Sequence, residues 1–147
     1  MQTAYYVLLF LALIVALVFS VLVLVCSVAT DSERQALNVN ADSAAAAIAA
    51  AVGASKLILL TDTNGVLADK KDAHSTISQL DAGQAREMVA SGKADSGMIP
   101  KLEGALYAIQ HGVGSVHLIN GGIPNALLVE VFTHSGVGTM VQTAFNR

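Results

Sequence analysis

The sequence lacks the residues from which disulfide frameworks and many metal sites are built. Among 147 residues it has no tryptophan, two prolines and a single cysteine. Cys26 has no second cysteine to form a disulfide with and no metal-ligand residue near it in the sequence, so a reducing compartment is expected. The four histidines are scattered and show no metal-ligand spacing. We therefore expect neither a disulfide framework nor a protein-bound metal.

Charge is also scarce. Only 13% of the residues are charged, and 8 Lys and Arg stand against 11 Asp and Glu, which gives a net charge of −3 without any basic block. Nucleic acid is therefore not an expected partner. The length fits one domain of ordinary size with a buried core.

Apolar residues make up 54% of the chain and are concentrated near its start. No charge occurs in the range Tyr5–Cys26, which is about the length that crosses a bilayer as a helix. Ser27–Ala29 also has the small-residue pattern of a signal-peptide cleavage site, although no positive charge precedes the apolar run. A third interpretation is a buried core strand, because residues 21–26 are rich in β-branched side chains. Residues 1–20 thus form a hydrophobic segment and candidate transmembrane helix, with membrane association through residues 4–28 as one option.

From residue 30 onward, helical and strand-like patterns alternate. This alternation indicates an α/β fold with a mostly parallel sheet and helices on both faces. One of the helices is introduced by Asp81 and Gln84, which have the spacing of a capping box. Helices are expected at 41–52, 81–91, 97–112 and 124–132, strands at 56–61, 115–119 and 139–141, a polar turn at 30–37, and a loop at 62–75.

Three polar clusters lie where ligands gather in such sheets, beyond the strand ends. They are Asn38–Asp42, Thr61–Gly65 and Asn120–Gly122. In the first, Asn40 suits a helix N-cap and Asp42 complements the helix dipole, but capping does not explain Asn38. Asn38 and Asn40 lie on the same side of an extended chain. The cluster is therefore either a helix cap or part of a polar binding site.

The second cluster is a weak signal when taken alone. Asp62 can act as a turn residue that bonds its own backbone, and the turn at Gly65 can bring backbone N–H groups close to a phosphate. No Gly-Lys-Ser/Thr follows, which excludes a Walker A loop.

Lys101 stands in the first turn of an expected helix, where the dipole disfavours a cation. A lysine placed there often serves an anion, and free N–H groups at the helix start would bind the same anion. A solvated surface lysine is the alternative interpretation.

The order of four motifs resembles the C-terminal half of the acetylglutamate kinases, a branch of the amino acid kinase family. The motifs are Asn-Val-Asn-Ala-Asp at 38–42, Lys-Leu-Ile-Leu-Leu-Thr-Asp at 56–62, Gly-Met-Ile-Pro-Lys at 97–101 and Gly-Thr-Met at 138–140. The resemblance covers about residues 21–141 and makes them the ATP-binding lobe of such a kinase, which we extend to residues 21–147. Family members phosphorylate the γ-carboxylate of N-acetyl-L-glutamate with ATP and Mg²⁺ in arginine biosynthesis.

The resemblance also implies roles for individual residues. Lys101 matches the lysine that stabilises the transition state, and Asp42 the aspartate that positions catalytic lysines. Asn38, with Asn40 beside it, matches the asparagine that binds N-acetylglutamate. ATP would be bound by two segments, Asp62, Thr63, Asn64, Gly65, Val66 and Leu67 in the first, and Lys93, Ala94 and Asp95 in the second. No metal ligand is implied.

The sequence also departs from the family pattern. Members begin with a half that carries a glycine-rich lysine motif, a second glycine-rich loop and a substrate-binding arginine, and the 147 residues contain none of these. We therefore expect a truncated cytoplasmic kinase, inactive by itself and associating with further copies. The alternative hypothesis is a membrane-anchored, non-catalytic nucleotide-binding or regulatory module.

Overall fold

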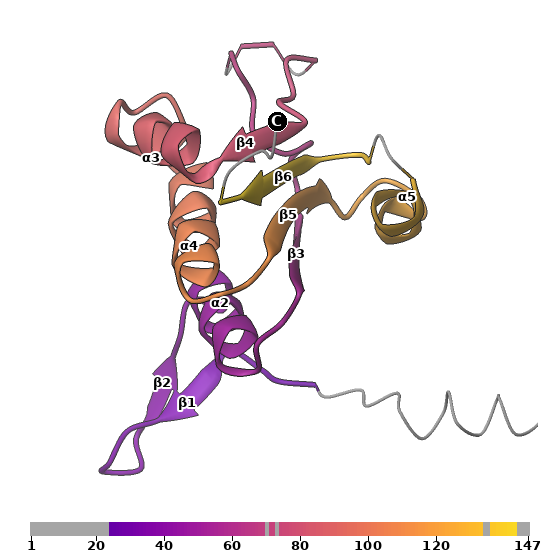
Figure 1. The fold of residues 1–147 in the computed structure, drawn as a ribbon. Coiled ribbons are helices and arrows are strands. Elements are labelled where there is room, and N and C mark those ends of the chain that lie inside the picture. Colours follow the sequence, from indigo (N-terminus) through magenta and orange to yellow (C-terminus); the bar gives the residue numbers. More distant parts are fainter. Residues whose placement is uncertain (1–23, 70, 73, 134–135, 144–147) are drawn as a thin grey trace, which may run out of the picture.

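A four-stranded mixed sheet forms the centre of the protein. The computed structural model describes residues 24–69, 71–72, 74–133 and 136–143, and the labels follow Figure 1. The strands are ordered β3 (Lys56–Thr61), β5 (Ser115–Asn120), β6 (Thr139–Gln142) and β4 (Gln79–Asp81). The pairs β3–β5 and β4–β6 are parallel, whereas β5–β6 is antiparallel. The expectation of a mostly parallel sheet is confirmed.

Helices cover both faces of this sheet. Figure 1 shows α2 (Ala41–Ala51), α3 (Ala82–Ala90) and α4 (Met98–Gln110) on one side and α5 (Ala126–Phe132) on the other. Each predicted helix is present, with ends that differ by at most two residues from the expected ones. The predicted α/β fold is therefore confirmed.

Local signals explain where the helices start and stop. The Asn40 side chain accepts the Ser43 N–H at 3.0 Å and caps α2, which stops before Gly53 at φ +64°. For α3 the capping box is complete: Asp81 accepts from Gln84 N at 2.8 Å, and the Gln84 side chain accepts from Asp81 N at 3.0 Å. Both helix starts are thus encoded within four residues of sequence.

The core lies between the sheet and the three-helix face. The central strand β5 is buried along its length, with Val116 and Leu118 fully inaccessible. Leu102 of α4 and Val141 of β6 pack into the same core cluster at 0% exposure. Burying one such side chain stabilises the fold by roughly 1.5–3 kcal/mol, so β5 and α4 anchor the residues at their ends.

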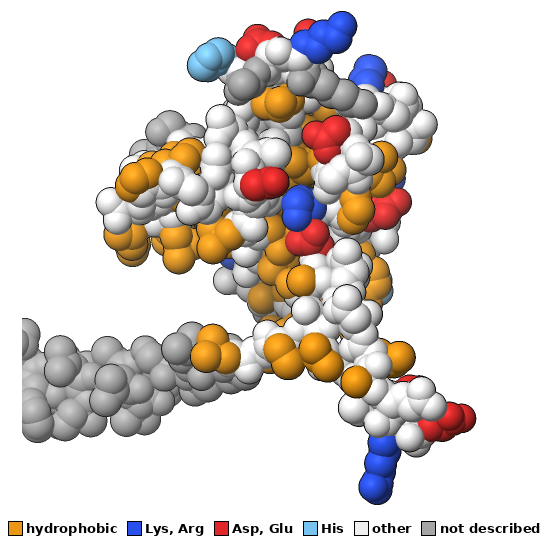
Figure 2. All heavy atoms as spheres, turned by 180° about the vertical axis from the view of Figure 1, so that it is seen from behind, with side chains coloured by type: hydrophobic (Ala, Val, Ile, Leu, Met, Phe, Trp, Pro, Cys, Tyr) orange, Lys and Arg blue, Asp and Glu red, His pale blue; other side chains and the backbone are white. Residues whose placement is uncertain are grey.

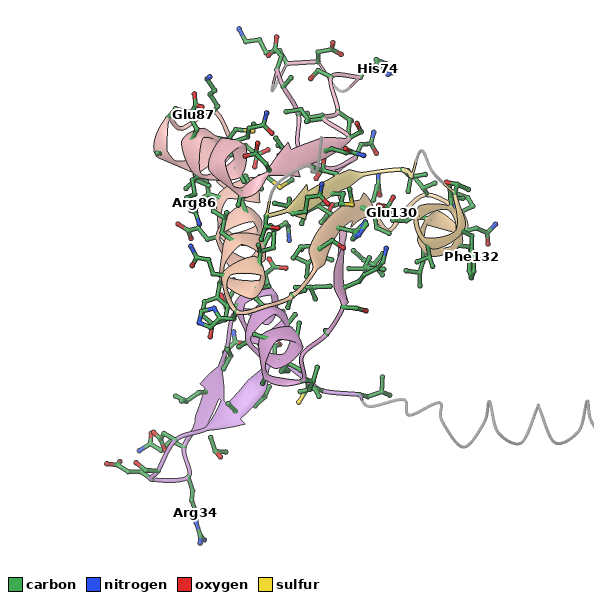
Figure 3. All side chains as sticks on the ribbon, in the orientation of Figure 1. Arg34, His74, Arg86, Glu87, Glu130 and Phe132 are labelled. Atoms are coloured by element: carbon green, nitrogen blue, oxygen red, sulfur yellow. The ribbon has the colours of Figure 1, made fainter. Side chains whose placement is uncertain are left out.

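Two short strands form a separate hairpin that the sequence did not predict. Strands β1 (Val28–Thr30) and β2 (Ala36–Asn38) pair in antiparallel register, where a polar turn was expected across residues 30–37. Figure 1 shows the hairpin projecting from the body, and Figure 2 shows charged side chains at its tip. Arg34 at the tip has φ +65° and points away from the body in Figure 3. The turn prediction is wrong at its ends, because backbone pairing forms there although every strand residue is exposed.

A buried core strand was one interpretation of residues 21–26, and the part of this range that the structure describes is not in the central sheet. Leu24–Ser27 are not in a strand, Leu24 is 87% exposed, and Val28–Thr30 pair only with β2 among the strands that the structure describes. Residues 1–20, predicted as a hydrophobic segment, lie outside the described residues. Within the described ranges no helix has both the length and the apolar character to cross a membrane.

Candidate functional site

The N-termini of α2 and α4 meet at one ion pair. Lys101 Nζ lies 3.0 Å from Asp42 Oδ2, and their side chains are 21% and 23% exposed. The two residues are 59 positions apart in the sequence. Gly104 of α4 packs against α2 at this point, and a Cβ added to it would lie 3.5 Å from the Asp42 carbonyl, an ordinary van der Waals distance. The predicted partners Asp42 and Lys101 are therefore brought into direct contact.

The electrostatics of this contact are unusual for a helix start. A cation in the first turn of α4 opposes the positive end of the helix dipole, and the Asp42 carboxylate in the first turn of α2 compensates it. The pair is only partly buried, so the Lys101 ammonium keeps access to solvent and to an anionic ligand. The Asp42 carboxylate therefore fixes the direction of the partly exposed Lys101 ammonium.

The start of α4 offers fewer N–H groups than its sequence predicted. Met98 N donates to Asp95 Oδ1 at 2.7 Å, Ile99 N donates to the Asp95 carbonyl at 3.0 Å, and Pro100 has no N–H. The expectation that free amides of this helix bind the anion is wrong for these positions, because Asp95 already satisfies them. Lys101 supplies the positive charge through its side chain.

The two asparagines of the first cluster differ in their surroundings. Asn40 Oδ1 is the N-cap of α2, so the capping interpretation is correct for this residue. Asn38 is the last residue of β2, exposed and opposite Val28 in the hairpin register. Its side chain is held close to the start of α2 by two residues of chain, and no capping contact accounts for it.

The segment after β3 is a tight turn with its own hydrogen bonds. Thr63 N donates to Thr61 Oγ1 at 3.1 Å, and Thr61 Oγ1 donates to the Thr63 carbonyl at 2.8 Å. Asn64 Oδ1 accepts from Asn120 Nδ2 at 2.8 Å. Two of the three polar clusters therefore meet beyond the carboxyl ends of β3 and β5, as the parallel register of these strands requires. Asp62 is exposed beside them.

The turn rests on residues from the far end of the chain. Gly65 has φ +98°, and a Cβ on it would lie 2.6 Å from Thr139 Oγ1, so only glycine fits. The next residue, Val66, is 1% exposed and donates its N–H to Thr139 Oγ1 at 2.8 Å. Gly138 also lacks room for a side chain, because a Cβ would collide with the Leu118 carbonyl. The Gly-Thr motif thus supports the turn instead of facing solvent.

The second predicted nucleotide segment borders a neighbouring cavity. Lys93 and Ala68 line a depression of about 250 Å³ together with Gln84 of α3, which places Lys93 near the end of the 62–67 turn. Lys93 is exposed and lies 3.9 Å from Glu87, a contact too long and too solvated to fix it. Ala94 is 5% exposed and contributes to the core.

Sequence inspection missed a buried polar cluster on the opposite face of the sheet. His117 Nδ1 lies 2.6 Å from Glu130 Oε1, and His117 Nε2 lies 3.0 Å from Ser115 Oγ. A carboxylate only accepts hydrogen bonds, so Nδ1 of His117 donates to Glu130, and Nε2 and the Ser115 hydroxyl share the second hydrogen bond. Figure 3 shows Glu130 directed from α5 toward the sheet. His117 and Glu130 face a cavity of about 480 Å³ that Lys56 also lines.

The hydrogen bonds run from Ser115 to His117 to Glu130, in the order found in a hydrolase triad, but the position of Ser115 does not suit catalysis. Ser115 is 8% exposed at the start of β5, so its hydroxyl is not presented to a substrate. Burial raises the pKa of Glu130, but the hydrogen bond from His117, the hydrogen bond from the Val137 N–H and the electrostatic attraction of the His117 ring outweigh burial and lower the pKa below its usual value of 4.5. Glu130 Oε2 accepts the Val137 N–H at 2.8 Å, which ties α5 to the segment before β6.

The described residues contain no group of three His, Cys, Asp or Glu side chains able to hold a metal ion. Mg²⁺ commonly keeps several waters and enters such sites on substrate phosphates with one or two carboxylates. Exposed Asp62 fits that kind of contact, whereas Asp42 is engaged by Lys101.

Comparison with known proteins assigns the family. The model of the amino acid kinase family matches residues 11–120, and the chain belongs to that family. Acetylglutamate kinases are among its relatives: that of Acaryochloris marina is 52% identical over 118 residues, covering 80% of this chain and 42% of the relative, and that of Methanocaldococcus jannaschii is 48% identical over 117 residues, covering 80% and 39%. The chain thus spans about two fifths of the length of these relatives.

A solved structure supports the same assignment. The N-acetylglutamate synthase of Neisseria gonorrhoeae aligns with a TM-score of 0.73 at 26% identity, covering 80% of this chain and 27% of that protein. The alternative hypothesis of a membrane-anchored, non-catalytic module finds no support among these relatives.

Proposed function

We propose that this chain provides the ATP-binding half of an acetylglutamate kinase, which transfers the γ-phosphoryl group of ATP to the γ-carboxylate of N-acetyl-L-glutamate. The observation that carries the proposal is the Lys101–Asp42 pair, which holds an ammonium group at the paired N-termini of α2 and α4. The 52% identity to an acetylglutamate kinase supports this acceptor over other substrates of the family.

The proposed chemistry depends on positioning and charge. In phosphoryl transfer a carboxylate oxygen of the acceptor attacks the γ-phosphorus, the bond to the β-phosphate oxygen breaks, and negative charge spreads over the equatorial oxygens. Lys101 would neutralise that charge, and Asp42 would keep the Lys101 ammonium directed at the equatorial oxygens. The ionic contact at 3.0 Å supports these two roles.

The nucleotide would lie along the turn after β3. Asp62 and Asn64 are its exposed residues, Thr63 is half-buried between them, and Lys93 borders the adjoining depression. Mg²⁺ would arrive on the phosphates of ATP, with Asp62 as the carboxylate nearest to them.

The acceptor would be bound near the start of α2. Asn38 is the exposed amide beside Asp42, so we propose that it contacts N-acetylglutamate, whereas Asn40 contributes through its side-chain N–H₂ while its oxygen caps the helix. The acceptor would then be within reach of Lys101.

Calorimetric titration of the 147-residue chain with MgATP tests the nucleotide part. We expect binding that weakens at least about tenfold in Lys101→Ala, since a charge-assisted contact to phosphate is worth about 1.5–3 kcal/mol. The matched control is Lys56→Ala, an exposed lysine at the amino end of β3, which should bind MgATP as the parent does. Absence of MgATP binding by the parent would refute the proposal.

A hydroxamate trap for acyl phosphate tests the transfer part. With MgATP and N-acetyl-L-glutamate, we expect no hydroxamate from the 147 residues assayed alone, because the resemblance assigns half of the acceptor site to elements that they do not contain. Acetylglutamate-dependent hydroxamate that is lost in Lys101→Ala would show that these residues suffice, and would overturn the expected inactivity.

A further inference from the structure

The hydroxyl group of Thr139 connects three separate parts of the chain. Thr139 is fully buried in β6, and its Oγ1 accepts the N–H of Val66 at 2.8 Å across 73 positions of sequence. The same hydroxyl donates to the carbonyl of Ile77 at 2.6 Å. Because it accepts one bond and donates the other, the hydroxyl is satisfied in both directions.

Val66 is held on both sides of its peptide unit. Its N–H goes to Thr139, and its carbonyl accepts from Ile77 N at 2.8 Å. Gly65, the residue before it, lies so close to Thr139 that any Cβ would stand 2.6 Å from the hydroxyl oxygen. The Thr139 side chain is therefore in direct contact with two consecutive residues of the 62–67 turn.

The segment that carries Thr139 is itself fixed. Gly138 passes against the Leu118 carbonyl without room for a side chain, and the Val137 N–H is bound by buried Glu130. The backbone directly before Thr139 is therefore held by β5 and by α5. A turn attached to such a support keeps one conformation before any ligand arrives.

We propose that Thr139 is a positioning residue for the nucleotide: its hydroxyl fixes the turn so that Asp62–Asn64 face ATP. This inference rests on the proposed function. Thr139 is buried and touches no substrate, so its effect reaches the nucleotide through the turn. Loss of the hydroxyl leaves the buried N–H of Val66 and the carbonyl of Ile77 without their partner.

Two measurements on the full 147-residue chain test this inference, namely hydrogen exchange at the Val66 amide and the dissociation constant for MgATP. In Thr139→Val, which keeps the side-chain shape, we expect the Val66 amide to exchange at least about tenfold faster and MgATP to bind about tenfold more weakly. Thr139→Ser keeps the hydroxyl and should stay within about threefold of the parent in both. Thr139→Ala also lacks the hydroxyl and takes the place of the valine variant if that one does not fold.

The matched control is Val141→Ala, a truncation at a fully buried position of the same strand. It lowers global stability without touching the turn, so exchange should rise across the whole core while MgATP affinity stays within about twofold. Equal weakening of MgATP binding in the Val141 and Thr139 variants would overturn the inference, as would an unchanged Val66 amide in Thr139→Val. If the parent does not bind MgATP, the proposed function fails, and Val66 exchange alone then decides whether Thr139 fixes the turn.

Discussion

The two members of the ion pair should contribute unequally to stability. Asp42 and Lys101 lie 3.0 Å apart and are about one fifth exposed, so the contact should stabilise the fold by about 1–2 kcal/mol, between an exposed pair and a buried one. Each residue also interacts with a helix dipole, worth about 0.5 kcal/mol: Asp42 favourably in α2, and Lys101 unfavourably in α4.

Substitution of Asp42 and substitution of Lys101 should therefore lower the free energy of unfolding by different amounts. Asp42→Asn loses the pair and the favourable dipole interaction, and should lower the free energy of unfolding by about 1.5–2.5 kcal/mol. Lys101→Met loses the pair but removes an unfavourable dipole interaction, so the loss should be only about 0.5–1.5 kcal/mol. The Asn40 cap does not depend on either substitution.

Urea unfolding of the parent, both single variants and the double variant gives these values and the coupling between the residues. We expect Asp42→Asn to be less stable than Lys101→Met by about 1 kcal/mol at low salt, with a coupling of about 1–2 kcal/mol. Added salt at about 0.5 M should reduce both quantities, because it screens partly exposed charges. If Lys101→Met costs as much as Asp42→Asn or more, Lys101 is a stabilising residue and the argument that its position serves a ligand is refuted.

Two further predictions concern stability. The lowered pKa of Glu130 means that its ionised form stabilises the folded state at pH values above about 4.5, and that this contribution is lost as the pH falls through the folded-state pKa. Glu130→Gln should lower the free energy of unfolding at pH 7 by about 1.5–3 kcal/mol and flatten its acid dependence, as measured by urea unfolding from pH 3 to 7. The control Glu87→Gln, at an exposed position, should do neither. The same acid dependence in both variants would contradict the assigned role of the His117 contact. Gly104→Ala should raise the melting temperature and the free energy of unfolding, the latter by up to about 1 kcal/mol, because its Cβ would meet only ordinary contacts at 3.5–3.8 Å. Gly83→Ala should stabilise the protein less, because its Cβ would lie 3.1 Å from the capping carboxylate of Asp81. Equal stabilisation by both substitutions would contradict this interpretation of the contacts.

Elements with local signals could be predicted from the sequence. The start of α2 depends on Asn40 and Ser43, and that of α3 on Asp81 and Gln84, so each is determined by residues three apart. Strands β3 and β5 were likewise predicted from their own short segments, without knowledge of their neighbours in the sheet.

Elements that depend on distant partners could not be predicted in this way. The three-residue strands β2 and β4 have too few residues to show a periodicity, and β4 is defined by pairing with β6 about sixty residues later. The interpretation of residues 21–26 as a core strand is wrong for Leu24–Cys26, because an apolar run does not specify what it pairs with. In the described part of that run, Leu24 is exposed.

In the candidate site, too, some residues could be predicted from the sequence, whereas contacts between distant residues could not. Lys101 was identified as a candidate because the helix dipole disfavours a cation in the first turn of a helix, and the family resemblance identified Asp42 as its partner. The support of the turn by Thr139 and the contact between Asn64 and Asn120 were not foreseen, since each joins residues more than fifty positions apart.

The central claim is that the turn after β3 and the paired starts of α2 and α4 form one nucleotide site. Hydrogen exchange of the 147-residue chain with and without MgATP tests this claim most directly. We predict slower exchange in residues 62–67 and 93–95 and at the start of α4, and unchanged exchange around His117 and Glu130 on the opposite face. Protection confined to the His117–Glu130 cavity, or no protection at saturating MgATP, would contradict the claim.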